Sequence, residues 1–286
     1  MKKTVKFFIY FFTILLLIEI AARVKLSLQS NNYRYLVYYN GIVKVPPEDF
    51  FNTCLLKAIQ FKRIRDNQKT VIMVGSSILE CVKADLEPKL AKEGWQNFKF
   101  IDGRKQQLIE FGDNSLILLE TMILPAVHSD FAFARNKLRR LLGVNLYTNL
   151  YNNSVFFLMF SEKITSAVSF TQEAKLGFIE EMLPIYDNTL ENLHNSGAKA
   201  IFINFPNYFL KGGNKLYGQH CGQVAAMASK KLTGLSNKYF INYLDIYGLH
   251  NDEFKKEDYT GDFHLRGQGA KKAAAYIFEA VQKLPN

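Results

Sequence analysis

From residue 70 to the C-terminus, short apolar runs alternate with longer amphipathic segments, and this alternation restricts the fold more than any other feature. The apolar runs predict five strands, at residues 70–74, 97–103, 154–160, 198–206 and 239–248. The segment 115–127 fits either a further strand or a buried helix, because an apolar run of that length suits both. Strands separated by helices indicate a parallel sheet that is covered on both faces.

Three segments have the periodicity of amphipathic helices, and they cover residues 78–93, 172–197 and 266–284. Pro184 is expected to interrupt or bend the second of these helices, and Gly197 is expected to end it. We therefore expect an α/β fold, a three-layer sandwich whose central sheet is mostly parallel and has five strands.

The first thirty residues differ from the rest of the chain. Lysines at positions 2, 3 and 6 precede a run of 16 residues from Phe7 to Ala22 that is apolar apart from Thr13 and Glu19. The run is either a cleaved signal peptide or an uncleaved anchor, although about 20 apolar residues are usual for a membrane span. Ile20 is a poor match to the small residue expected three positions before a cut after Ala22. We therefore favour a single N-terminal transmembrane helix with the bulk of the chain outside the cell membrane.

The charge and the cysteines exclude several classes of partner and cofactor. The net charge of +10 would suit nucleic acid, but an exported domain rarely meets it, so anionic lipid headgroups or an acidic envelope polymer are the expected partners. Cys54, Cys81 and Cys221 have no CxxC spacing and are assigned to packing, with a Cys54–Cys81 disulfide left open. The other histidines, at positions 128, 194, 220 and 250, show no pairing typical of metal ligands, and we expect no metal and no cofactor.

The strongest chemical signal joins two distant parts of the chain. The strand at 70–74 ends in Gly75-Ser76-Ser77, at the carboxyl edge where reactive groups of parallel sheets gather. Near the C-terminus, Asp262 and His264 stand two positions apart in a polar loop before the last helix. A serine hydroxyl becomes a nucleophile when an imidazole takes its proton, and a carboxylate can orient that imidazole. The alternative for the two serines is a simple helix cap.

These motifs resemble the SGNH/GDSL hydrolase superfamily, whose fold is a flavodoxin-like sandwich. "GSS" stands where the family has Gly-Asp-Ser, and "DFHL" followed by "GQGA" is similar to its last motif; the resemblance covers about residues 70–283. It implies that Ser77 is the nucleophile and His264 the base. It also implies that the backbone amides of Ser77 and Gly103 bind the oxyanion.

The sequence departs from the family pattern at two points. The position three before the histidine, usually Asp, is Gly261, so Asp262 is the expected acid, as in the branch linked to alginate O-acetylation. The Gly-x-Asn motif, which normally supplies an oxyanion asparagine, has no clear counterpart. A missing oxyanion donor costs a few kcal/mol of barrier.

The anchored layout is similar to envelope acyl-transfer proteins, including D-alanyl-transfer proteins of teichoic-acid modification and relatives paired with membrane-bound O-acyltransferases. The expected organisation is an anchor at 1–30, a juncture at 31–69 and a catalytic domain at 70–286. The resemblance implies an extracytoplasmic serine acyltransferase or esterase acting on acylated cell-surface polysaccharide. Hydrolysis and transfer stay open, because they share the acyl-enzyme. The alternative is a non-catalytic module of the same fold that binds glycan or a membrane O-acyltransferase partner.

Overall fold

The computed structural model describes residues 2–28, 58–103, 108–121, 138, 141–154, 156–157, 172–207, 221–260 and 264–284. The chain divides into two compact units, and each is described by itself. The first unit comprises Met1–Phe51 and Ala134–Val168, and the second comprises Asn52–Phe133 and Ser169–Asn286.

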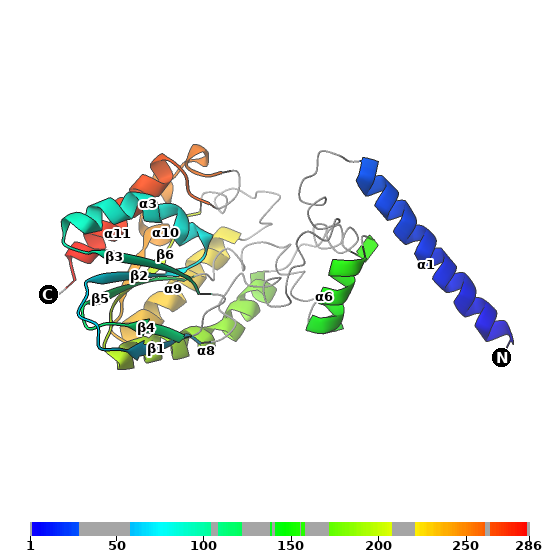
Figure 1. Ribbon diagram of the computed structural model, residues 1–286, viewed down its shortest axis with the longest axis horizontal. Coiled ribbons are helices and arrows are strands. Elements are labelled where there is room, and N and C mark those ends of the chain that lie inside the picture. Colours follow the sequence, from blue (N-terminus) through cyan, green and yellow to red (C-terminus); the bar gives the residue numbers. More distant parts are fainter. Residues whose placement is uncertain are drawn as a thin grey trace. The chain divides into compact units, whose positions relative to one another are not determined.

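The second unit is built on a parallel sheet of five strands in the order β3-β2-β5-β6-β7 (Figure 1). All of its strand pairs are parallel, so the carboxyl ends of the strands lie at one edge of the sheet. The expected parallel five-stranded sheet is thereby confirmed. The strands are β2 (Thr70–Gly75), β3 (Asn97–Asp102), β5 (Ser115–Glu120), β6 (Lys199–Asn204) and β7 (Asn242–Asp245).

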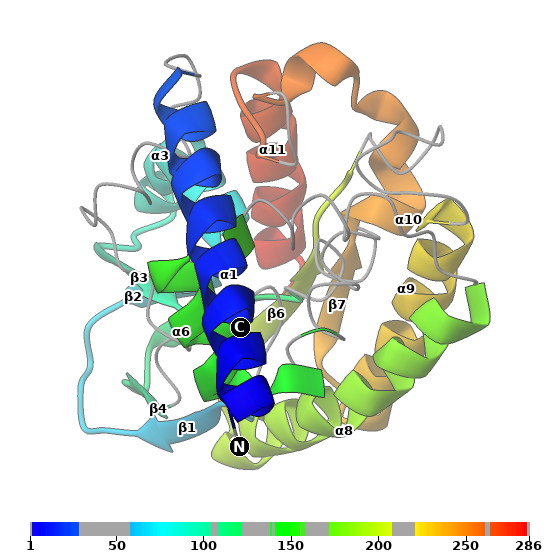
Figure 2. The ribbon, with the colours of Figure 1, turned by 90° about the vertical axis from the view of Figure 1, so that its right-hand side faces the viewer.

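Helices cover both faces of this sheet, which gives the three layers expected from the sequence (Figures 1 and 2). Successive residues of a strand point to opposite faces. Val71 and Met73 therefore pack with α3 (Ser77–Lys92) and α11 (Gln268–Gln282). Ile72 and Val74 pack on the other face with α8 (Gln172–Ser196) and α9 (Cys221–Lys238). Both faces of β2 are fully buried, which is why its sequence is apolar without alternation.

A second, smaller sheet lies beside this core. β1 (Gln60–Arg63) and β4 (Leu108–Phe111) pair in parallel, and the sequence did not predict either strand. β1 falls in the segment interpreted as a juncture, yet its residues belong to the second unit. The short helices of this unit are α10 (Ile246–His250) and two 3₁₀ turns at Asn251–Glu253 and Lys256–Asp258.

The long helix α8 is continuous through Pro184, so the expected interruption is not found. Its end is as predicted: Gly197 follows α8 with φ +66°, a left-handed conformation that glycine adopts readily. Helix α3 lies within one residue of its predicted bounds.

The predicted strand at 154–160 is wrong where the structure describes it, because Phe156 and Phe157 are helical. Ser154 Oγ accepts a hydrogen bond from the Phe157 amide over 3.0 Å, as a helix cap does. An apolar run alone does not separate a strand from a buried helix turn. The ambiguous segment 115–127 provides the missing strand, since Ser115–Glu120 is the buried strand β5.

The first unit contains α1 (Lys2–Leu28) and α6 (Val144–Asn153). Glu19, the one acidic residue of the N-terminal apolar run, accepts hydrogen bonds from Ser154 Oγ at 2.9 Å and from the Phe156 amide at 3.0 Å. It also pairs with Arg23. These partners compensate the charge of Glu19 within an apolar helix.

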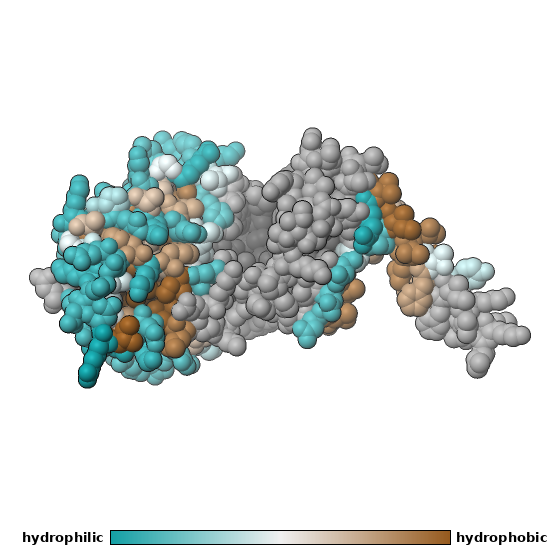
Figure 3. Space-filling view, in the orientation of Figure 1, coloured by the Kyte–Doolittle hydropathy of each residue, from teal (hydrophilic) through white to brown (hydrophobic). Residues whose placement is uncertain are grey.

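Apolar side chains are exposed along α1, and Figure 3 shows them as a brown surface. In the part of the chain that the structure describes, no helix combines the length and the apolarity needed to cross a membrane.

Candidate active site

Ser77 lies at the turn from β2 into α3. β2 ends at Gly75, and Ser76 is the N-cap, with extended backbone angles of φ −98° and ψ −174°. Ser76 Oγ accepts a hydrogen bond from the Ile78 amide over 3.2 Å, so Ser76 caps the helix. The capping role therefore falls to the first serine, and the half-buried hydroxyl of Ser77 has a different partner.

His264 reaches the same place from the other end of the chain. Tyr259 and Leu265 form an antiparallel bridge, and the Thr260 amide donates to the His264 carbonyl over 3.0 Å. This narrow loop leads into α11 and fixes the backbone of His264. Ser77 Oγ lies 2.6 Å from His264 Nε2. At this distance the imidazole can take the hydroxyl proton, as a serine nucleophile requires.

The Ser77 amide is available as a hydrogen-bond donor. The Leu79 amide donates to Glu120 Oε2 over 3.3 Å. The Glu80 amide donates to the Ser76 carbonyl, also over 3.3 Å. The Ser77 amide, by contrast, donates to no described residue. It points from a helix N-terminus, where the backbone dipoles favour negative charge, and it can serve an oxyanion.

The second predicted oxyanion donor is engaged elsewhere. The Gly103 amide donates to the Gly75 carbonyl over 3.0 Å and so continues the pairing of β2 with β3. This bond places Gly103 beside the turn that carries Ser77, but its oxyanion role stays a prediction and requires this hydrogen bond to be shared or opened.

Glu120 is the residue of this site that the sequence did not reveal. It is the last residue of β5, its exposed fraction is 1%, and its carboxylate lies under the nucleophile turn. Glu120 Oε2 accepts from the Ser76 amide over 2.7 Å, and Oε1 accepts from Ser76 Oγ over 2.7 Å. A Cβ at Gly75 would lie 2.6 Å from Glu120 Oε2, so the turn requires glycine there. A carboxylate that ends an apolar strand was the available signal.

We expect Glu120→Ala to destabilise the protein by about 3 kcal/mol, because it leaves the buried amides of Ser76 and Leu79 without an acceptor. Ester turnover should fall at least about tenfold, since the turn that carries Ser77 loses its support. Glu120→Gln is the matched variant, because its amide oxygen can still accept from both backbone amides. Chemical denaturation and steady-state rates of the full chain check this. Equal stability of the Ala and Gln variants would contradict it.

Asp262, the expected acid, lies outside the described residues. Asp258, four residues before Asp262, is buried and has other partners: its carboxylate accepts from the Lys255 amide over 3.0 Å and pairs with Lys272 over 2.9 Å. Burial raises the pKa of Asp258, but these two donors outweigh it and hold the pKa below its usual value. Asp258 therefore stabilises the base of the His264 loop.

The remaining histidines take no part in this site where the structure describes them. His250 Nδ1 lies 2.8 Å from Glu253 Oε1, and its ring stacks on Tyr276. His194 packs near Tyr239. Over the described ranges, no group of three or more His, Cys, Asp or Glu side chains is placed to hold a metal ion. Cys54, His128 and His220 lie outside these ranges, and the expectation of no metal or cofactor stays a prediction.

Half-buried serine and histidine side chains at hydrogen-bond distance, at the carboxyl edge of a parallel sheet, define a site of the serine-nucleophile class. No family model matches the sequence, and no curated protein matches it.

The comparison with solved structures finds esterases and lipases. A GDSL-like lipase from Bacteroides thetaiotaomicron is 14% identical, with 75% of this chain and 88% of that chain covered and a TM-score of 0.36. A lipase from a goat rumen metagenome is 12% identical, with 74% and 96% covered and a TM-score of 0.43. An acetyl-xylooligosaccharide esterase from Geobacillus is 10% identical, with 77% and 96% covered and a TM-score of 0.39.

Proposed function

We propose that this chain is a serine esterase or acyltransferase that acts on O-acyl groups of a cell-envelope polysaccharide. The observation that carries the proposal is the 2.6 Å distance between Ser77 Oγ and His264 Nε2, together with a Ser77 amide that has no acceptor among the described residues. Both features are needed for acyl transfer through a covalent serine intermediate.

The reaction begins when Ser77 Oγ attacks the carbonyl carbon of the ester and its proton passes to His264 Nε2. The Ser77 amide donates to the oxyanion of the tetrahedral intermediate. The bond to the sugar oxygen then breaks, and the imidazolium of His264 returns the proton to that oxygen. We assign to Asp262 the role of accepting a hydrogen bond from the protonated Nδ1 of His264, which orients the imidazole. The acyl group stays on Ser77 until water or a sugar hydroxyl, deprotonated by His264, removes it.

Hydrolysis and transfer are distinguished by the acceptor. Comparison of glycan O-acyl content in cells with and without the gene tests the proposal: a fall in the absence of the gene means transfer, and a rise means hydrolysis. A transferase of this kind would receive its acyl group from a partner, for which a membrane-bound O-acyltransferase is the candidate. Unchanged acyl content in cells that express the protein would contradict the envelope-polysaccharide assignment.

Membrane attachment through the N-terminal segment is part of the proposal. It is supported by the lysines at positions 2, 3 and 6 and by exposed apolar side chains on α1, among them Phe7, Phe12 and Leu16. The catalytic domain would then face the outside of the cell. Alkaline extraction of membranes from cells that make the full chain tests the attachment. Recovery of the intact chain in the extract would overturn it.

The engaged amide of Gly103 favours a second candidate, a non-catalytic module that holds glycan or a membrane partner. This candidate predicts that a variant with both Ser77→Ala and His264→Ala maintains envelope acylation in cells. Loss of acylation in those cells would exclude it.

A further inference from the structure

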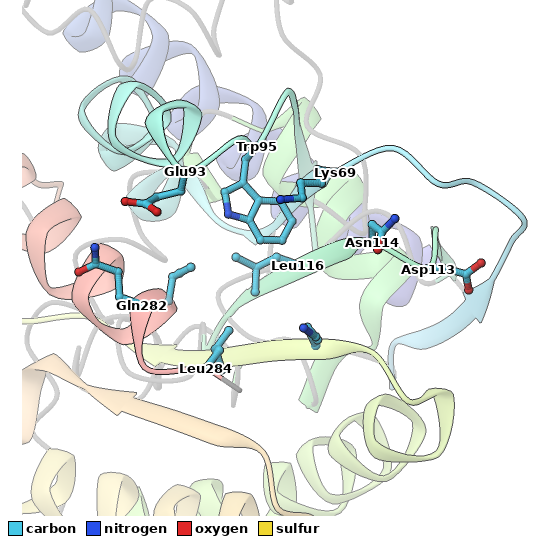
Figure 4. A pocket seen from close by; sticks show the side chains of 10 residues that line it. Lys69, Glu93, Trp95, Asp113, Asn114, Leu116, Gln282 and Leu284 are labelled. Carbon is cyan, nitrogen blue, oxygen red and sulfur yellow. The ribbon is translucent and has the colours of Figure 1, made fainter. Parts of the chain in front are cut away.

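A cavity lies in the second unit, at the opposite edge of the sheet from Ser77. Its volume is about 430 Å³, within the usual range for small-molecule sites. Figure 4 shows the side chains around it. They come from the loops before β2 and β5, the start of β6 and the C-terminal ends of α3 and α11. The lining residues are Lys69, Glu93, Trp95, Asp113, Asn114, Leu116, Lys199, Val281, Gln282 and Leu284.

The cavity is separate from the serine site. Lys69 directly precedes β2, whereas Ser77 follows it, and β2 has six residues. A strand rises about 3.3 Å per residue, so the two sites are about 20 Å apart along the sheet. Helix α11 spans the same distance, since it begins after His264 and ends at Gln282. A ligand in this cavity therefore does not contact Ser77 directly.

The cavity combines an aromatic surface with planar polar groups. The half-buried Trp95 side chain lies across the cavity, with Leu116 and Leu284 below it in Figure 4. The amide of Gln282 and the carboxylate of Glu93 stand on one side of Trp95, and the amide of Asn114 stands on the other side. A pyranose ring has C–H groups on its faces and hydroxyls around its edge. An indole surface flanked by amide and carboxylate groups matches both parts.

The charges of the lining favour an anionic ligand. Lys69 and Lys199 contribute two ammonium groups, and neither forms a hydrogen bond or an ion pair with a described residue. Asp113 pairs with Arg63 over 3.7 Å, which compensates its charge. Glu93 is then the single acidic side chain without such a partner in the described lining. Once Arg63 is counted with the lining, the local charge is positive, and a ligand carboxylate can take one of the ammonium groups as its partner.

We propose that this cavity binds an acidic saccharide, a pyranose that bears a carboxylate. Trp95 provides the surface against which the ring packs, and Lys69 and Lys199 hold the carboxylate. Glu93, Asn114 and Gln282 bond to the hydroxyls. The inference does not rest on the reaction assigned to Ser77, because no part of that machinery lines the cavity.

Trp95 is the only tryptophan in the chain, so its fluorescence reports on this cavity alone. Titration of the full chain in detergent with tetragalacturonate should give a saturable change in tryptophan emission. Maltotetraose, the neutral probe, should bind at least tenfold more weakly. The double variant Lys69→Gln with Lys199→Gln should weaken tetragalacturonate binding by at least tenfold. Lys230→Gln, an exposed lysine of α9 outside the cavity, is the matched control and should bind as the wild type does.

Three results would overturn the proposal. Equal affinity for tetragalacturonate and maltotetraose would refute the role of the lysines. Inorganic phosphate that binds as tightly as tetragalacturonate would show an anion site without a sugar surface. Full binding by Trp95→Phe, measured by calorimetry and with an unchanged melting temperature, would place the saccharide elsewhere. Saturable binding of tetragalacturonate by the Ser77→Ala variant supports the proposal. It also shows that binding in this cavity does not depend on the proposed reaction at Ser77.

Discussion

Ser77→Ala is expected to abolish covalent labelling of the full chain by an activated acetyl ester and to lower ester turnover by about 10⁴-fold or more. The hydroxyl at 2.6 Å from His264 Nε2 is the proposed nucleophile, and alanine offers no atom that can form the acyl bond. Intact-mass measurement after brief incubation detects the adduct as one added acetyl group in the wild type. His264→Ala should give a similarly large loss, because the base that accepts the proton is gone.

Ser76→Ala is the matched control, since it removes a hydroxyl one position away in the same turn. Ser76 caps α3 and bonds to Glu120, so its loss should cost about 1 kcal/mol of stability and still permit labelling. Labelling of Ser77→Ala to the wild-type extent would show that the nucleophile is another residue. Labelling that is lost in Ser76→Ala but retained in Ser77→Ala would assign the attack to Ser76.

The nucleophile turn could be predicted because its signals are local. The segment from Val71 to Glu93 contains these signals in direct succession. It begins with an apolar run rich in β-branched residues, continues with a glycine and two serines, and ends with a helical periodicity. Each step depends only on neighbours in the chain, and the structure places β2 and α3 where the pattern did. The end of α8 at Gly197 could be predicted for the same reason, because glycine readily adopts the left-handed conformation found at helix ends.

A carboxylate at the end of an apolar strand marks Glu120 as unusual, but its role could not be predicted because it depends on strand pairing. Only the register of β2 with β5, in which Val74 lies opposite Leu119, brings the carboxylate beneath Gly75. The residues around Glu120 in the chain are an ordinary apolar run. The small β1–β4 sheet was missed for a similar reason: each strand has four residues, and the pair forms across more than forty positions of sequence. Short strands carry too little periodicity to be separated from loops.

One of the two expected oxyanion donors, the Gly103 amide, already donates a hydrogen bond to the Gly75 carbonyl. Among the described residues at this turn, the Ser77 amide is the single unengaged donor, so we expect oxyanion stabilisation to rest mainly on this amide. Removing one oxyanion donor typically costs about 3 kcal/mol of barrier. Catalysis by this chain should accordingly depend strongly on how well His264 is oriented.

Asp262→Asn is therefore expected to lower turnover by several orders of magnitude, though less than Ser77→Ala does. Residues two apart in an extended segment point to the same side, and on this sequence argument Asp262 is the proposed partner of His264 Nδ1. Asparagine would favour the wrong tautomer, in which Nε2 carries the proton and cannot accept it from Ser77; in a well-studied triad this change costs about 10⁴-fold. Comparison of kcat and KM for the full chain checks the assignment, since an orienting acid should affect kcat more than KM.

Asp258→Asn is the matched control because it makes the same change four residues earlier. The Asp258 carboxylate is occupied by Lys272 and by the Lys255 amide, so kcat should change little while stability at neutral pH falls by about 1 kcal/mol. Since its folded pKa lies below the ordinary value, this contribution is present above about pH 4 and is lost as the pH falls through the folded pKa. The free energies of unfolding of the wild type and of Asp258→Asn should therefore become equal in acid. Near-normal kcat in Asp262→Asn, with a large loss in Asp258→Asn, would transfer the orienting role to Asp258.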